Sequence, residues 1–206
     1  MKAKFILMFI VAVIYICMPT MAVTTLTVDM TVDDNFDLYI STDDNQLGTY
    51  IGSGTGTYEP PGWRQAYTFT HDLTPGVINY IHVVGWGIYG TRAAFLGEFA
   101  LSNSDFFFEN GTQELFTESI NWNISDVGFG QSYYTPDDLV MNDGSENWQA
   151  IPGISYYANW IWSNDGYDLT TRYFSTAITP IPAPGAIILG SIGAGFVRWM
   201  RRKRAI

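Results

Sequence analysis

The sequence predicts an all-β fold for residues 23–180, an antiparallel β-sandwich of the jelly-roll type. Short segments alternate apolar and polar residues with a period of two, as half-buried strands do. Turn-forming residues separate these segments at short intervals, and no part of the region keeps a helical period beyond one or two turns. Many short strands at this spacing are typical of sandwiches and jelly rolls, and we find no internal repeat or second domain.

The strands are assigned from this alternation. The first is predicted in "TTLTVDMTV" (24–32), whose inward residues are Leu26, Val28, Met30 and Val32. The segment "FDLYIS" (36–41) continues the pattern. Further strands are expected in "AYTFT" (66–70), "VINYIHVV" (77–84), "AAFLGEFAL" (93–101), "ELFTESINW" (114–122), "YYANWIW" (156–162) and "TRYFSTAI" (171–178). The segments between them, such as "GSGTGTYEPPG" (52–62), are rich in turn residues.

The first 22 residues have the three parts of a secretory signal peptide. Lys2 and Lys4 precede an apolar run, and small residues up to Ala22 form a cleavage site for signal peptidase. A membrane anchor is the alternative, although the apolar run is short for a bilayer span. Cleavage after Ala22 would remove Cys17, the only cysteine, so the exported chain would have no disulfide and would depend on its core for stability.

Charge is unevenly distributed along the chain. All 20 acidic residues lie in residues 23–180, from Asp29 to Asp168, and only Arg64, Arg92 and Arg172 of the 10 basic residues lie in the same region, which gives residues 23–180 a net charge of −17. Binding phosphates requires a basic surface. The composition therefore argues against nucleic acid as a partner and is compatible with cations or with simple solubility.

Residues 181–206 form a distinct C-terminal segment. Prolines precede a small-residue apolar stretch from Gly185 to Val197, and the basic residues that follow are Arg198, Arg201, Arg202, Lys203 and Arg204. We expect a short transmembrane helix, close to the lower limit of about 17 residues for a span. The positive-inside rule would keep the basic cluster in the cytoplasm, and the signal peptide would then place residues 23–180 outside the inner membrane.

This C-terminal arrangement resembles the PEP-CTERM sorting signal that exosortases recognise in Gram-negative bacteria. The motif here is Pro182, Ala183, Pro184 and Gly185, followed by "AIILGSIGAGFVRW" and "MRRKR". Ala183 stands where the family has glutamate. The resemblance implies transient retention in the inner membrane, processing by an exosortase-type enzyme, and delivery to the cell surface or the extracellular matrix. A plain single-pass anchor is the alternative.

The string "VDDNFDLYIS", together with "GWRQAYTFTHDLTPGVINYIHVVGWG" and "AAFLGEF", resembles galactose-binding-like jelly-roll domains. The matching positions are Asp34, Asn35, Tyr39, Trp63, Leu73, Gly76, Ile81, Val83 and Gly97. The segments "ANWIWS" and "YFST" resemble the last strands of that family. Because many such domains bind sugars and many do not, the resemblance implies a sandwich more firmly than an activity.

Two acidic clusters are candidate calcium sites. The first comprises Asp33, Asp34, Asn35 and Asp37, and hard oxygen ligands from a loop suit calcium, which the galactose-binding-like family often carries at a sandwich edge. The second, in "STDDNQLG", contains Asp43 and Asp44. Neither has the spacing of an EF-hand. The alternative is that these residues cap strands and form turns.

Aromatic residues supply the candidate sugar site. Exposed indole rings stack on sugar faces. Trp63, beside Arg64 after a Pro-Pro turn, and Trp86, between two glycines, are placed for a ligand, whereas Trp160 and Trp162 are expected to pack on one face of a strand. An isolated arginine such as Arg64 can instead neutralise a neighbouring carboxylate.

The sequence contains no catalytic motif that we recognise. The two histidines, His71 and His82, are not accompanied by HExxH, and the glycine-rich segment lacks the end of a phosphate loop. We therefore expect a structural or adhesive surface protein of an extracellular polysaccharide layer. A carbohydrate-binding module and, with less support, a secreted hydrolase are the alternatives.

Overall fold

The computed structural model describes residues 22–55, 62–88, 92–144, 148–167 and 169–182. The predicted signal peptide before Ala22, the sorting motif beyond Pro182 and the basic tail lie outside these residues. The part from Val23 to Pro180 forms one compact unit. Within the described residues, no helix is long and apolar enough to cross a membrane.

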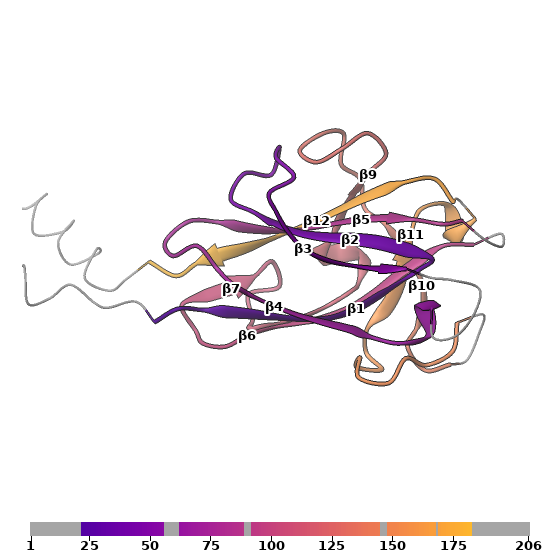
Figure 1. Ribbon diagram of the computed structural model, residues 1–206, viewed down its shortest axis with the longest axis horizontal. Helices are drawn as coiled ribbons and strands as arrows, with labels where there is room; N and C mark the ends of the chain where they lie inside the picture. Colours follow the sequence, from indigo (N-terminus) through magenta and orange to yellow (C-terminus); the bar gives the residue numbers. More distant parts are fainter. Residues whose placement is uncertain (1–21, 56–61, 89–91, 145–147, 168, 183–206) are drawn as a thin grey trace, which may run out of the picture. The chain divides into compact units, whose positions relative to one another are not determined.

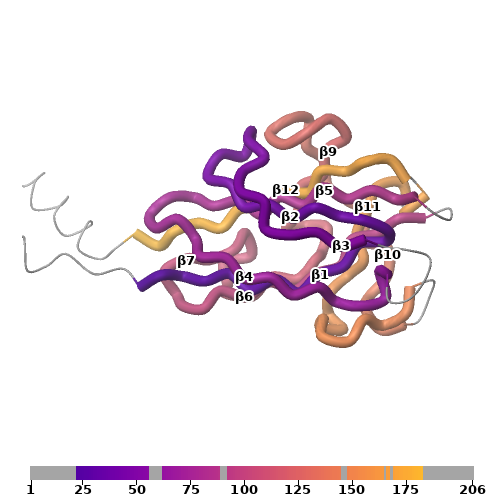
Figure 2. Tube along the Cα trace, in the orientation of Figure 1, coloured from indigo at the N-terminus to yellow at the C-terminus, as the bar shows by residue number. Residues whose placement is uncertain are grey.

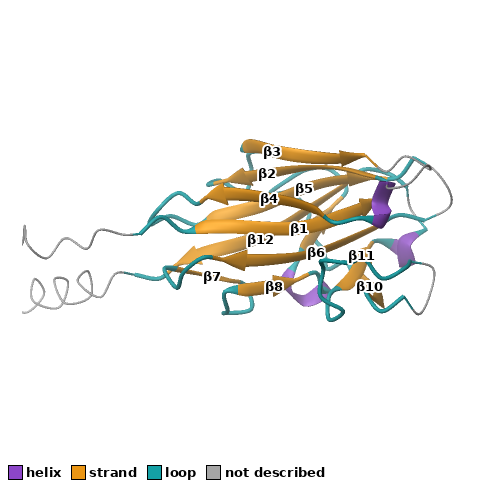
Figure 3. Ribbon diagram, turned by 60° about the horizontal axis from the view of Figure 1, so that its bottom comes forward, coloured by secondary structure: helices purple, strands orange, loops and turns teal. Residues whose placement is uncertain are grey.

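The unit consists of β-strands and three short 3₁₀ turns (Figure 3). The strands are β1 (Thr25–Asp33), β2 (Asn35–Ser41), β3 (Thr49–Thr55), β4 (Tyr67–Asp72), β5 (Asn79–Trp86), β6 (Ala94–Leu101), β7 (Phe106–Phe108), β8 (Glu114–Phe116), β9 (Asn123–Ser125), β10 (Asp137–Met141), β11 (Asn159–Trp162) and β12 (Arg172–Pro180). The 3₁₀ turns are η1 (Gly62–Arg64), η2 (Ser119–Asn121) and η3 (Asn164–Gly166).

The strands form two six-stranded sheets, which confirms the predicted β-sandwich. The first sheet has the order β10-β11-β6-β1-β4, with β8 also paired to β6. The second has the order β3-β2-β5-β12-β7, with β9 also paired to β12. Every pairing is antiparallel. The strands of each sheet therefore come from distant parts of the sequence, and the two layers face each other (Figure 1).

The period-two pattern of β1 and β2 is confirmed by burial. Leu26, Val28 and Met30 are almost completely buried, whereas the residues between them are only partly covered. All eight predicted strand segments contain a strand, although the segment 114–122 is a strand only at Glu114–Phe116 and then turns through η2. Four short or irregular strands, β3, β7, β9 and β10, were not predicted from the sequence.

The prediction of a turn throughout residues 52–62 is wrong at its start, since Gly52–Thr55 belongs to β3. The two glycines are needed there for close packing. A Cβ atom on Gly52 would lie 2.2 Å from the Phe69 ring, and one on Gly54 would lie 2.2 Å from the Phe36 ring. Glycine in a strand often marks such a close approach.

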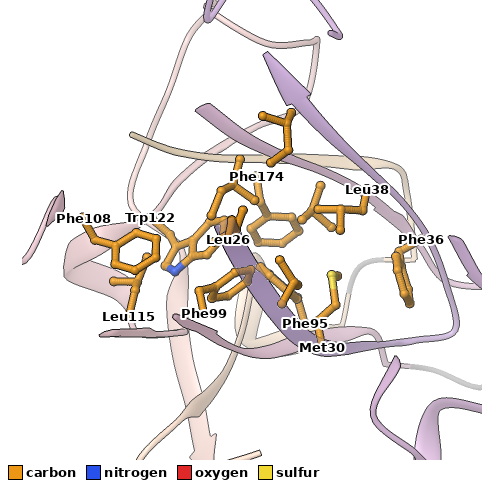
Figure 4. Close-up of a cluster of buried hydrophobic side chains, with 14 of the residues drawn as sticks. Leu26, Met30, Phe36, Leu38, Phe95, Phe99, Phe108, Leu115, Trp122 and Phe174 are labelled. Carbon is orange, nitrogen blue, oxygen red and sulfur yellow. The ribbon is translucent and has the colours of Figure 1, made fainter. Parts of the chain in front are cut away.

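The main core lies between the two sheets and is dominated by aromatic rings (Figure 4). Phe95 is at its centre, with ring centroids 5.1 Å from both Trp122 and Phe174. The edge-to-face and tilted arrangements are those that aromatic quadrupoles favour. This core, which needs no disulfide, holds the sheets together.

A second hydrophobic cluster covers the outer face of the first sheet. Ala94, Leu96 and Trp160 point outward from β6 and β11 and are covered by Trp148, Ile151 and Ile154 of the segment between β10 and β11. Trp160 and Trp162 are both buried, as predicted, but they do not share a face. Trp162 packs in the main core against Phe174, 5.2 Å away between ring centroids.

The chain enters and leaves the sandwich at the same end. Thr25 at the start of β1 pairs with Asp72 of β4, and Ile178 near the end of β12 pairs with Asn79 at the start of β5. We call this the terminal end (Figure 1). At the opposite end, called here the far end, β1 and β5 finish and β2, β6 and β12 begin.

The fragment Val23–Pro180 is expected to fold without the segments that flank it, because both hydrophobic clusters lie entirely within it. Its unfolding in urea should give coincident transitions by far-ultraviolet circular dichroism and by tryptophan fluorescence. Transitions that separate would contradict folding of the fragment as one cooperative unit, since they would show that one part of the sandwich unfolds before another.

Candidate functional site

The far end brings together part of the site predicted from the sequence. Asp33 ends β1, Asp34 forms the connection, and Asn35 begins β2. The peptide bond between Asp33 and Asp34 is cis. Trp63 and Arg64 lie in η1, which is held to β1 by the hydrogen bond that Thr31 Oγ1 donates to the Trp63 carbonyl at 2.8 Å.

Asp33 is the most perturbed acid of this group. The indole Nε1 of Trp148 donates a hydrogen bond to Asp33 Oδ2 at 3.0 Å, and the Asp33 side chain also bonds to that of Asp34. Burial is the main cause that raises the pKa of the Asp33 carboxyl to about 7, and the bond to Asp34 adds to the rise. The bond from Trp148 and the charge of Arg64 oppose it. Folding therefore shifts Asp33 toward its protonated form.

The other members of the predicted calcium site point to different surroundings. Asp34 is almost fully buried and accepts a hydrogen bond from the Ile88 backbone at 2.6 Å, so it orders the turn after β5. Asp37 lies on β2 beside Tyr39 and contributes, after burial, to the raised pKa of that phenol. Within the described residues, no three His, Cys, Asp or Glu side chains are placed to share a metal ion.

Trp63 and Arg64 form a compact pair at the far end. The guanidinium carbon of Arg64 lies 4.8 Å from the centroid of the Trp63 ring, which is a cation–π arrangement. Trp63 also packs edge-on against Trp160, with 5.9 Å between ring centroids. Its ring is half-buried, so only one part of it is available to a ligand.

Two residues beside this pair were not assigned to a site from the sequence. Arg92 lies over the rings of Tyr167 and Trp148, at 4.3 Å and 5.8 Å from their centroids. Tyr167 is 60% exposed. The local sequence does not show that Arg92, Tyr167 and Trp148 form a group, because they come from three separate connections and meet only in the folded chain.

Trp86 does not join Trp63. On β5 the residues Ile81, Val83 and Gly85 face the core, and a Cβ atom on Gly85 would lie 3.1 Å from Trp162. Trp86 therefore lies on the outer face of the second sheet, opposite Asn35 of β2. Trp63, by contrast, packs on the cluster outside the first sheet. The predicted sugar site built from both tryptophans is not formed as one surface.

A polar cluster around Asp44 lies on the outer face of the second sheet, where the sequence predicted a second candidate calcium site or a turn. Asp44 Oδ1 accepts hydrogen bonds from Ser175 Oγ at 2.7 Å and from Tyr133 OH at 2.9 Å. His82 Nε2 lies 3.1 Å from the same oxygen. Asp44 therefore ties the loop 42–48 to β5, to β12 and to the neighbouring loop 126–134 (Figure 2).

The histidine of this cluster is fully buried. Its ring stacks on Phe129 with 3.8 Å between centroids and 11° between planes. Burial lowers the pKa of His82 below its ordinary value, and the hydrogen bond with Asp44 only partly opposes this. Burial also raises the pKa of Tyr133 to about 12, so this phenol remains a donor to Asp44. The arrangement is a structural clamp in which Asp44 is the shared acceptor.

Replacing Asp44 with alanine is expected to lower the free energy of unfolding by about 2 kcal/mol, because buried donors lose their acceptor. Asp43→Ala is the matched control, since the Asp43 side chain is exposed and its hydrogen bonds to described residues stay within the loop, to Asn45. Urea unfolding of both variants measures the difference. Equal losses would show that the Asp44 clamp adds nothing to the fold.

No family model, curated protein or solved structure matches this chain. The structure itself defines the class of protein. The chain forms an antiparallel β-sandwich with a second hydrophobic cluster outside one sheet and a buried Asp44–His82 clamp outside the other.

Proposed function

We propose that this protein is exported and displayed on the surface or in the extracellular matrix of a Gram-negative-type bacterium, where it has a structural or adhesive role in the polysaccharide layer. Signal peptidase would remove residues 1–22, and an exosortase-type enzyme would process the C-terminal segment after transient retention in the inner membrane. The jelly-roll connectivity and the relation to galactose-binding-like domains belong to the same proposal.

The observation that best supports this role is the position of the chain ends in the sandwich. β1 begins and β12 ends at the terminal end. A chain tethered through the segment before β1 or through the segment after β12 would therefore keep its far end free. Figure 3 shows the start of β1 and the end of β12 on the same side. The far end carries the Trp63–Arg64 pair and the exposed ring of Tyr167, which are suited to contact with a matrix.

The charge distribution agrees with a secreted, matrix-associated role. The three arginines of the sandwich are each engaged with protein groups: Arg64 with Trp63, Arg92 with Tyr167 and Trp148, and Arg172 with Asp126 at 3.4 Å. The 20 acidic residues thus dominate the charge of this region, which favours neutral or cationic partners over nucleic acid.

The test follows both ends of the chain in a host that has an exosortase-type enzyme and in the same host with that gene deleted. Mass spectrometry should find Val23 at the N-terminus in both hosts, and loss of the basic tail only where the enzyme is present. Pro184→Leu should block tail removal, and Ile181→Val, three residues earlier, is the matched control. An intact tail in both hosts would instead indicate a plain single-pass anchor.

A carbohydrate-binding role at the far end is the second candidate function. The half-buried Trp63 ring with Arg64 above it supports this role, because an indole face and a guanidinium suit a sugar ring and its hydroxyls. Sugars that bind there should perturb the NMR signal of the Trp63 indole N–H, and Arg64→Ala should weaken the effect. Binding unchanged by Arg64→Ala would place the sugar elsewhere.

A further inference from the structure

A pocket opens at the terminal end, on the side where the edge strands of the two sheets meet. Its volume is about 340 Å³, and its lining includes Ser41 from the end of β2, Thr49 from the start of β3 and His71 from β4. β3 and β4 are edge strands of different sheets. The pocket therefore lies at the seam of the sandwich, away from the Trp63–Arg64 pair at the far end.

One wall of this pocket is the loop 42–48, and hydrogen bonds fix its shape. Ser41 Oγ donates to the Asp43 carbonyl at 2.7 Å and accepts from the Asp43 backbone N–H at 3.1 Å. Gly48 has a φ of 87°, and a Cβ atom there would lie 2.3 Å from the Ile40 carbonyl oxygen. On the other side of the loop, Asp44 is held by the clamp described above. A wall fixed in advance lowers the entropic cost of binding.

The lining combines apolar surface with polar side chains that can form hydrogen bonds. It presents the hydroxyl-bearing residues Thr42 and Thr49, the amide of Gln46 and the imidazole of His71, and the described residues that line it include neither lysine nor arginine. His71 is half-buried in this lining, and within the described part of the chain its side chain makes no hydrogen bond to another protein group.

Asp43 gives this region a stable negative charge. The backbone and side-chain N–H groups of Asn45 lower the pKa of the Asp43 carboxyl, so it remains ionised at neutral pH. A ligand with carboxylate or phosphate groups would be repelled. A neutral ligand with several hydroxyl groups, or one with an ammonium group, would find acceptors on several sides.

We propose that this pocket binds a single neutral or amino sugar residue of hexose size. The volume lies within the range of small-ligand pockets, which starts at about 300 Å³. Because no Phe, Tyr or Trp is among the described residues that line the pocket, recognition depends on hydrogen bonds to hydroxyl and ammonium groups rather than on stacking against such a ring. The inference goes beyond the proposed surface role and does not depend on how the chain is sorted.

The experiment titrates three probes, glucose, glucosamine and glucuronate, into the full chain purified in a detergent without a sugar headgroup. Saturation-transfer NMR reports binding. Glucose and glucosamine should both bind, and glucosamine should bind about fivefold more tightly. Asp43→Asn should remove that preference. Glucuronate should not bind. Equal binding of glucuronate, or no binding of any probe, would overturn the proposal.

Two single substitutions at exposed positions test whether the sugar binds in this pocket, and neither disturbs the core. Thr49 is exposed and lines the pocket, so Thr49→Trp should fill it and abolish binding. Thr70 is exposed on the outer side of β4, and Thr70→Trp should leave binding unchanged. Binding that survives Thr49→Trp would exclude the pocket, and melting curves of both variants would show that each is folded. The cleavage pattern of the tail is measured separately, so failure of either proposal is recognised independently.

Discussion

Replacing Trp160 with alanine is expected to lower the free energy of unfolding by about 3 to 5 kcal/mol, since removing a large buried aromatic residue leaves a cavity that its surroundings only partly fill. Trp160 has no exposed surface. Its ring lies between Trp148, stacked at 5.6 Å, and Trp63, edge-on at 5.9 Å. The loss would be a large part of the total stability of a domain of this size.

The replacement by phenylalanine separates ring packing from hydrogen bonding. Among the described residues, the Trp160 indole N–H has no hydrogen-bond partner. Trp160→Phe therefore removes an unsatisfied donor and should cost about 1 kcal/mol or less. Trp148→Phe should cost more, because it breaks the hydrogen bond to Asp33. Urea unfolding followed by circular dichroism measures all three variants.

The losses measured for the three variants show how much the second hydrophobic cluster, outside the first sheet, stabilises the fold. A loss as large for Trp160→Phe as for Trp160→Ala would contradict the packing argument, since phenylalanine keeps most of the ring contact. A small loss for both would mean that the segment between β10 and β11 covers the first sheet without stabilising it. The expected order is Trp160→Ala first, Trp148→Phe second and Trp160→Phe last.

The predicted strands show which part of the fold can be inferred from the sequence. Alternation is a local signal, so β1 and β2 were predicted within one residue of their ends. β3 was missed because Gly52 and Gly54 suggest a turn, and their role depends on the rings of Phe69 and Phe36, which are distant in the sequence. A sequence pattern cannot show which ring will lie above a glycine.

The candidate site could be predicted only in part for the same reason. Trp63, Arg64 and Asp33 were chosen from the sequence, and the structure places them near one another at the far end. Trp86 was also chosen, but the alternation along β5 sends it to the other outer face. The shared acceptor role of Asp44 was missed because its partners lie on β5, β12 and the loop 126–134.

Asp33 gives the largest expected dependence of stability on pH. Its carboxyl has an ordinary pKa of 3.8 and a pKa of about 7 in the folded protein, so the folded state binds the proton more tightly. The resulting stabilisation is fully present below about pH 4 and is lost as the pH rises toward 7 and beyond. At pH 8 the loss is at most about 4 kcal/mol, since each pKa unit corresponds to about 1.4 kcal/mol.

Asp33→Asn should remove this dependence, because asparagine keeps an oxygen for the Trp148 N–H and a donor for Asp34 but has no charge to bury. The variant should match the original protein near pH 4 and be more stable at pH 8. Asp37→Asn is the control for the change in net charge. The lowered pKa of His82 acts in the opposite sense, giving stability that is lost as the pH falls below about 6.5.

Because His82 is unchanged in both proteins, its contribution cancels in the difference between Asp33→Asn and the original chain. Urea unfolding of both proteins across this pH range gives that difference directly. A difference that grows with pH identifies Asp33 as a carboxyl that folding keeps protonated. A difference that is constant, or equal to that of Asp37→Asn, would mean that Asp33 ionises as easily in the folded chain as in the unfolded one, and the far end would then carry a full carboxylate beside Arg64 at neutral pH.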